Sequence, residues 1–69
     1  MRKSYSKRFK IVVALEAMVW GVSTMSNQLD LDRRLISKWK RRVETQYFPA
    51  VTKMEEADIL GMIDLLDLI

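Results

Sequence analysis

Apolar side chains recur every three or four residues along most of the chain, which is the period of one face of an α-helix. The first such segment runs from about residue 7 to residue 20. Its apolar side chains form two rows: Phe9, Val12, Val13, Ala17 and Trp20 in one, and Ile11, Leu15 and Val19 in the other. Two rows predict a helix that is buried over a wide arc. Ser4 or Ser6 can cap its start, and Gly21 stands where a left-handed residue often ends a helix.

The next two predicted helices are separated by a tight turn. Ser23 or its neighbour can cap a short helix from about Thr24 to Leu29. The sequence Leu29-Asp30-Leu31-Asp32 predicts a turn, because aspartate bonds to its own backbone and tolerates a left-handed conformation. Asp32 is then placed to cap a third helix, from residue 33 to about residue 46.

The last predicted helix has an apolar stripe and an acidic back. It follows a linker of roughly four to six residues around Pro49, and Thr52-Lys53-Met54-Glu55 fits the capping-box pattern, so the helix should begin after Thr52. Asp64 and Asp67 lie opposite the stripe. The stripe, widened by Leu65, consists of Ile59, Met62, Ile63, Leu66 and Ile69. Because a protein in water seldom leaves such a surface open, the helix packs on its own domain, pairs with a second copy or binds another protein.

Composition and charge restrict the function. The chain has 69 residues, enough for one small domain, and it has no cysteine and no histidine. Disulfides, zinc fingers and imidazole chemistry are therefore excluded. The two glycines are isolated and form no phosphate-binding loop, and the acidic residues lie at helix caps or on an outer face. We expect no enzyme activity, no catalytic or metal site and no cofactor.

The sequence also argues against a membrane protein. The longest stretch without a charge, residues 17–29, contains serine, threonine, asparagine and glutamine. A bilayer span needs about 20 mainly apolar residues, and the apolar run after the basic start is too short for a signal peptide. We therefore expect a location in the bacterial cytoplasm, at the nucleoid, or in the nucleus of a eukaryotic cell.

The formal net charge of +3 conceals a strong asymmetry. Residues 1–53 hold all twelve lysines and arginines against four acidic residues, which gives +8. Residues 54–69 hold five acidic residues and no basic one, which gives −5. A basic body with an acidic end is typical of a module that binds a polyanion and is joined to a second element. The alternative is an unevenly charged, solvated surface.

The third predicted helix has an apolar side and a basic side. Ile36, Trp39 and Val43 fall within about 60° of one another, with Leu35 at their edge. The opposite side carries hydrogen-bond donors: Arg33, Arg34, Ser37, Lys38 and Arg41, flanked by Lys40 and Arg42. Arginine matches the guanine edge with two hydrogen bonds, and lysine and serine reach bases or phosphates. We therefore predict sequence-specific binding of double-stranded DNA. Arg33, Arg34, Ser37 and Lys38 would contact bases in the major groove, and Lys40, Arg41 and Arg42 would contact phosphates.

Two stretches carry a resemblance to a known family: Tyr5-Ser6…Phe9-Lys10…Val13-Ala14-Leu15-Glu16-Ala17, and Ile36-Ser37-Lys38-Trp39-Lys40. Residues Tyr5–Val43 resemble the helix-turn-helix domain of bacterial insertion-sequence transposases, the protein of the first reading frame, and are similar to Brinker-type and homeodomain-like domains. The resemblance implies an all-α, three-helix DNA-binding domain, serving a transposase or a small transcription regulator. It also implies a buried framework: Met25, Ser26, Leu29, Leu31, Ile36 and Trp39. Asp30 stands where this family usually has glycine in the turn, and Val12, Val19 and Trp20 are more apolar than its first helix.

The predicted organisation has two parts. Residues 1–48 form the helix-turn-helix domain with a basic N-terminal arm, and residues 49–69 form an additional acidic, amphipathic helix for packing or self-association. The arm tracks phosphates or the minor groove, or serves only solubility. Its basic residues are Arg2, Lys3, Lys7, Arg8 and Lys10. The expected partners are duplex DNA and a second copy, since two half-sites usually need a dimer. The alternative function is a protein-interaction adaptor or inhibitor that uses the C-terminal helix.

Overall fold

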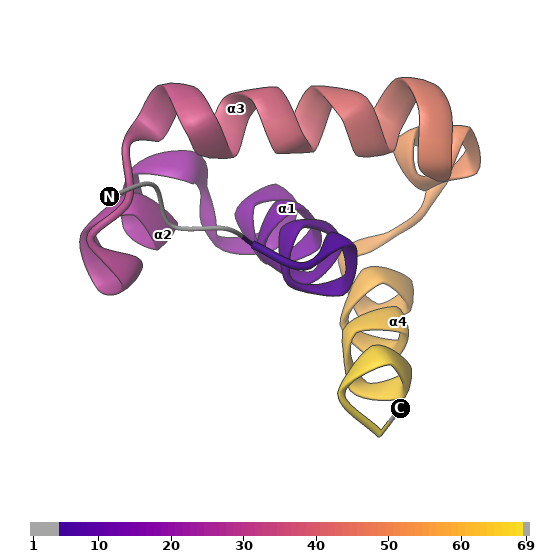
Figure 1. Cartoon of the computed structure of the whole chain (residues 1–69). Helices are drawn as coiled ribbons and strands as arrows, with labels where there is room; N and C mark the ends of the chain where they lie inside the picture. Colours follow the sequence, from indigo (N-terminus) through magenta and orange to yellow (C-terminus); the bar gives the residue numbers. More distant parts are fainter. Residues whose placement is uncertain (1–4, 69) are drawn as a thin grey trace.

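The chain from residue 5 to residue 68 is helical throughout, apart from short connections (Figure 1). The computed structural model describes these residues, and it describes side chains as far as Leu66. The elements are α1 (Lys7–Trp20), α2 (Val22–Leu29), α3 (Arg33–Arg42), the π-helical turn η1 (Val43–Tyr47), the 3₁₀ helix η2 (Pro49–Lys53) and α4 (Glu56–Leu68). The all-α prediction is confirmed for the described part of the chain, in which four α-helices pack together.

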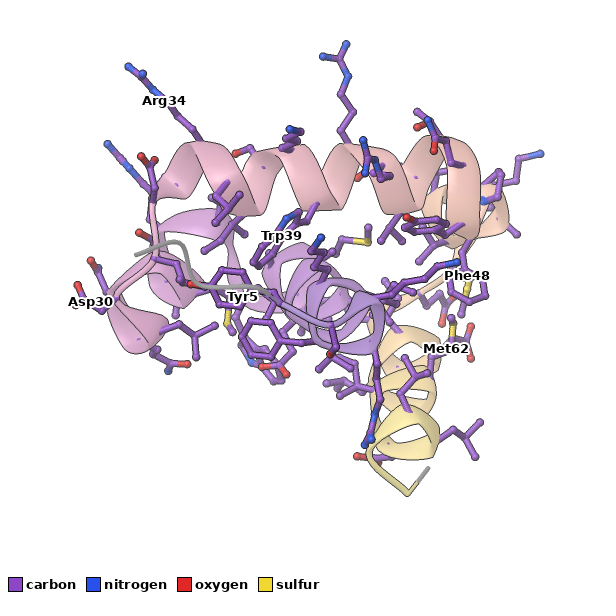
Figure 2. All side chains as sticks on the ribbon, in the orientation of Figure 1. Tyr5, Asp30, Arg34, Trp39, Phe48 and Met62 are labelled. Atoms are coloured by element: carbon purple, nitrogen blue, oxygen red, sulfur yellow. The ribbon has the colours of Figure 1, made fainter. Side chains whose placement is uncertain are left out.

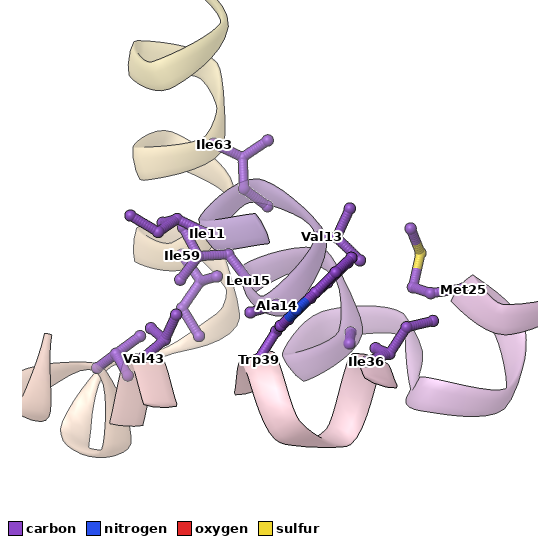
Figure 3. Close-up of a cluster of buried hydrophobic side chains, with 12 residues drawn as sticks. Ile11, Val13, Ala14, Leu15, Met25, Ile36, Trp39, Val43, Ile59 and Ile63 are labelled. Atoms are coloured by element: carbon purple, nitrogen blue, oxygen red, sulfur yellow. The ribbon is translucent and has the colours of Figure 1, made fainter. Parts of the chain in front are cut away.

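α1 is the central helix and has the predicted bounds. The Phe9 backbone N–H donates to the Ser6 hydroxyl at 3.1 Å, so Ser6 is the cap. α1 packs against α2, α3 and α4, and Ala14 and Leu15 have no exposed surface (Figure 3). The wide buried arc is therefore confirmed. Trp20 is an exception to its predicted row, because half of its surface is exposed.

A single glycine joins α1 to α2. Gly21 has φ +99° and ψ 148°, a positive-φ conformation that side-chain-bearing residues rarely adopt. Its N–H donates to the Ala17 carbonyl at 2.9 Å, and its own carbonyl accepts from the Met25 N–H at 3.2 Å. One residue thus ends α1 and starts α2 at Val22. The prediction of a later start with a Ser23 cap was wrong, because α2 has no side-chain cap.

The turn between α2 and α3 forms as predicted. Asp30 has a left-handed backbone, with φ 54° and ψ 46°. The N–H groups of Asp30 and Leu31 both donate to the Ser26 carbonyl, and the Ser26 hydroxyl donates to the Leu31 carbonyl. Asp32 caps α3, since its Oδ1 accepts from the Arg34 N–H at 2.8 Å. These bonds pair several of the backbone groups that the ends of α2 and α3 would otherwise leave without a partner.

The segment between α3 and α4 differs from the prediction in detail. The regular helix ends at Arg42, and the Phe48 N–H donates to the Val43 carbonyl at 2.8 Å across a wider π turn. The Thr45 hydroxyl donates to the Arg41 carbonyl at 2.8 Å, a bond that competes with the regular backbone ladder. The predicted capping box does not form. Instead, the Thr52 hydroxyl donates to the Pro49 carbonyl inside η2.

α4 packs on its own chain. Ile59 and Ile63 are buried in the core (Figure 3). Met62 and Leu66 are half-buried against it. Of the three arrangements that the stripe left open, packing on its own domain is the one in this structure. Ile69 lies outside the described residues. Leu65 was expected to widen the stripe, but 64% of its surface is exposed, so it lies off the buried side.

An aromatic cluster fixes the start of α1 to the middle of α3. Tyr5 stacks on Phe9 with ring centroids 5.3 Å apart and an angle of 14° between the rings. Both rings meet Trp39 edge-on, Tyr5 at 5.3 Å and Phe9 at 6.0 Å. These geometries are the favourable ones for aromatic pairs. Tyr5 and Phe9 therefore hold Trp39 on the side of α3 that faces the protein interior. This contact sets the rotation of α3 about its axis.

Candidate nucleic-acid interface

The orientation of α3 follows from its buried stripe. Ile36, Trp39 and Val43 are buried, and Leu35 is half-buried beside them. Residues spaced by three and four lie on one side of a helix, so the stripe turns the remaining positions outward. α3 packs through this side against α1 and α2.

The opposite side of α3 gathers the predicted donors. We call this surface the basic face; its residues are Arg33, Arg34, Ser37, Lys38 and Arg41. All five are exposed, and together they line one shallow, open depression. Figure 2 shows Arg34 pointing away from the body of the protein. The structure therefore brings together the four predicted base-contacting residues and the first of the phosphate-contacting ones.

A second shallow depression continues the basic face toward the end of the helix. It is lined by Lys38, Arg41, Arg42, Thr45 and Gln46. Thr45 and Gln46 are not among the predicted site residues, because they carry no charge and stand at the predicted end of the helix. Their spacing of four from Arg41 and Arg42 was the signal that places them on the same side.

Lys40 has a different setting from its neighbours. Its side chain is half-buried, and its Nζ lies 4.0 Å from Glu44 Oε1 one turn along the helix. More than a third of each side chain is in contact with solvent, and a helix pair of this spacing contributes about 0.3–0.5 kcal/mol. Its charge is partly balanced within the chain, so Lys40 flanks the basic face with a weaker field than Arg41 or Arg42.

The described basic residues near the N-terminus do not all lie on one surface. Arg2 and Lys3 lie outside the described residues. Lys7 is the first residue of α1, and its Nζ lies 4.7 Å from the centroid of the Tyr47 ring, within the range of a cation–π contact. Lys7 is therefore anchored beside η1. Lys10, three residues farther on, is half-buried on the same side of α1, whereas Arg8 is exposed on another side.

The expected buried framework is present except at one position. Met25, Ile36 and Trp39 are buried, and Ser26 and Leu31 are half-buried around the turn. Leu29 was expected to be buried, but 37% of its surface is exposed. It is the last residue of α2, where the chain turns away at Asp30 and no helix covers it.

Within the described residues, no group of three or more carboxylate side chains comes close enough to hold a metal ion. No helix in the described part of the chain has the length and hydropathy needed to cross a bilayer.

No protein-family model, curated protein or solved structure matches this chain.

Proposed function

We propose that the protein binds double-stranded DNA in a sequence-specific manner, with α3 in the major groove. The observation that carries the proposal is the division of α3 into two sides. One side is anchored by Ile36, Trp39 and Val43, and the other presents the basic face to solvent. The major groove of B-DNA is wide enough for an α-helix, and arginine and lysine are its commonest readers of guanine.

The neighbouring elements support a helix-turn-helix interpretation. α2 has eight residues, the left-handed Asp30 starts the turn, and Asp32 caps α3. A short helix, a tight turn and a second helix with an exposed polar side form the order of that motif. The resemblance to transposase domains adds a cellular setting, in which the protein serves a transposase-like assembly or a small transcription regulator.

The two ends of the basic face would have different tasks. The N-terminal part of a recognition helix points toward base edges, so Arg33, Arg34, Ser37 and Lys38 would read bases. Arg41 and Arg42, with Thr45 and Gln46, lie farther along α3 and its π turn, where contacts to phosphate position the helix. Lys40 would add less, because Glu44 balances part of its charge.

Titration with duplex DNA across a salt series tests the proposal. If roughly four to eight phosphates are neutralised, the logarithm of affinity should fall with the logarithm of salt concentration with a slope of several units. Arg41→Ala should lower both affinity and slope. Lys53→Ala removes an exposed positive charge in η2, away from α3, and is the matched control. No binding at low salt, or a flat salt response, would reject the proposal in favour of the adaptor function.

A further inference from the structure

Two arginines of the basic face lie on the side of α3 directly opposite the core. Each residue of an α-helix advances by about 100°, so Arg34 and Arg41, seven residues apart, are separated by only about 20° around the axis. Both lie within about 20° of the direction opposite the buried stripe, and Figure 2 shows Arg34 and Trp39 on opposite sides of the helix. Ser37 and Lys38 lie about 50° to either side of that direction. We call Arg34 and Arg41 the central row of the basic face.

The central row is open to solvent and held in one orientation. Both arginines are exposed, and both line the same shallow depression. Within the described residues neither guanidinium is paired with a carboxylate; the ion pair found there joins Lys40 to Glu44. The Trp39 ring, which packs against Tyr5 and Phe9, keeps the opposite side of α3 turned inward. The row is therefore available to a ligand without any rotation of the helix.

Rotation about the helix gives Arg41 a role that its position along the helix does not. The proposed function places Arg41 among the phosphate contacts because of its distance along α3. When a helix lies in the major groove, however, the side chains opposite its core meet base edges, and those on its flanks meet the backbones at the rims. Arg42 is about 100° from Arg41 and lies on a flank. Arg41 is thus placed with Arg34 to reach a base, and Arg42 to reach a phosphate.

The chemistry of the central row matches guanine. A guanidinium donates hydrogen bonds and accepts none. In the major groove guanine presents two acceptors, N7 and O6, whereas adenine and cytosine each present an amino donor. Residues 33–42 contain no aspartate, glutamate, asparagine or glutamine, which are the side chains that accept from those amino groups. Guanine is therefore the base that offers each arginine of the row two acceptors.

The spacing of the central row sets the spacing of its targets. Seven residues rise about 10.5 Å along an α-helix, and three base-pair steps of B-DNA rise about 10 Å. A helix lying along the groove therefore brings Arg34 and Arg41 to base pairs three steps apart. We infer, resting on the proposed function, that the DNA site contains two G·C base pairs three steps apart, one read by Arg34 and the other by Arg41.

Selection from a random duplex library with the full chain tests the spacing. The bound sequences should align on two G·C pairs separated by two other base pairs, with each guanine in either strand. Sites with another spacing, or with A·T at one of the two positions, would overturn the inference and leave DNA binding standing. No binding to any duplex at low salt would overturn the proposed function, and the inference with it.

An atom-specific probe assigns each arginine to its base pair. 7-Deazaguanine lacks the N7 acceptor but still pairs with cytosine, and at either position it should weaken binding by roughly fivefold or more. Arg34→Ala should abolish this effect at one position and Arg41→Ala at the other, because the donor to N7 is then absent. Arg42→Ala removes a neighbouring arginine on the flank and, as the matched control, should keep both effects. If Arg41→Ala also kept both, the inference would fail and Arg41 would contact phosphate.

A change of specificity gives the second test. Glutamine matches the adenine edge with one donor and one acceptor. Arg41→Gln should therefore lose the preference for G·C at the Arg41 position, in favour of A·T, and keep it at the Arg34 position. Repeating the selection with this variant measures both positions together. Loss of the preference at the Arg41 position alone supports the inference, whether or not A·T replaces it. An unchanged preference at both positions, expected of a residue that contacts only phosphate, would overturn it.

Discussion

The Asp32 carboxylate accepts a hydrogen bond from the backbone N–H of Arg34, at 2.8 Å. The residue that caps α3 is thus bonded to a residue of the basic face. Both residues are exposed, so the bond is made at the surface, where the first turn of α3 projects. The cap therefore helps to fix the backbone from which Arg33 and Arg34 extend.

Removing this cap should destabilise the protein. Asp32→Ala leaves the Arg34 N–H without its side-chain acceptor, and the free energy of unfolding should fall by about 1 kcal/mol. Asp32→Ser keeps an acceptor and should recover most of the loss. Urea unfolding followed by circular dichroism measures both. If alanine and serine gave equal stability, the hydrogen bond would have no net energetic role.

Replacing the left-handed turn residue Asp30 with glycine should instead stabilise the protein. Asp30 has φ 54°, a conformation that costs most side-chain-bearing residues roughly 1–2 kcal/mol and costs aspartate less. Asp30→Gly should therefore raise the stability by up to about 1 kcal/mol, less the added flexibility of the unfolded chain. Asp30→Ala keeps the strain without the polar side chain and should lower it. The same denaturation measurement checks both variants, and a glycine variant less stable than the alanine variant would contradict the strain argument.

The bounds of α1, the turn and the start of α3 could be predicted because their signals are local. Ser6 precedes a long periodic segment, and Asp32 precedes the basic helix, so each cap stands next to the pattern that it starts. The two sides of α3 followed from periodicity alone. If α3 were rotated so that Ile36, Trp39 and Val43 faced outward, charged side chains would be buried in their place, at a high energetic cost.

The remaining differences between prediction and structure arise where the local sequence is compatible with two arrangements and does not show which is the more stable. Thr52 is an acceptable N-cap, but its hydroxyl bonds inside η2, because Pro49 starts a 3₁₀ turn first. The π turn after Arg42 has no periodic signature. The place of α4 depends on the apolar surface of α1: Ile11 and Leu15 belong to the same buried cluster as Ile59 and Ile63, although they are far from α4 in the sequence.

Two apolar residues of α4 should respond differently to truncation. Ile63 is buried in the core, so Ile63→Ala should lower the free energy of unfolding by about 2–4 kcal/mol. Leu65 is largely exposed, and Leu65→Ala should change it by less than about 0.5 kcal/mol. Thermal unfolding at equal protein concentration distinguishes them. Similar losses for the two variants would mean that α4 does not pack on α1 as described.

The last prediction separates residues that read bases from residues that contact phosphate. Once a preferred DNA site is selected from a random library, Arg34→Ala or Lys38→Ala should weaken binding to it by about 1–3 kcal/mol and relax the preference at one position. Arg42 lies beyond the base-reading part of α3. Arg42→Ala should therefore weaken binding to every sequence alike and lower the slope of log affinity against log salt concentration by about one unit. Fluorescence anisotropy with the selected site and a scrambled duplex measures both effects. If all three variants lost affinity for the two duplexes in equal proportion, the N-terminal half of α3 would not be the part that reads sequence.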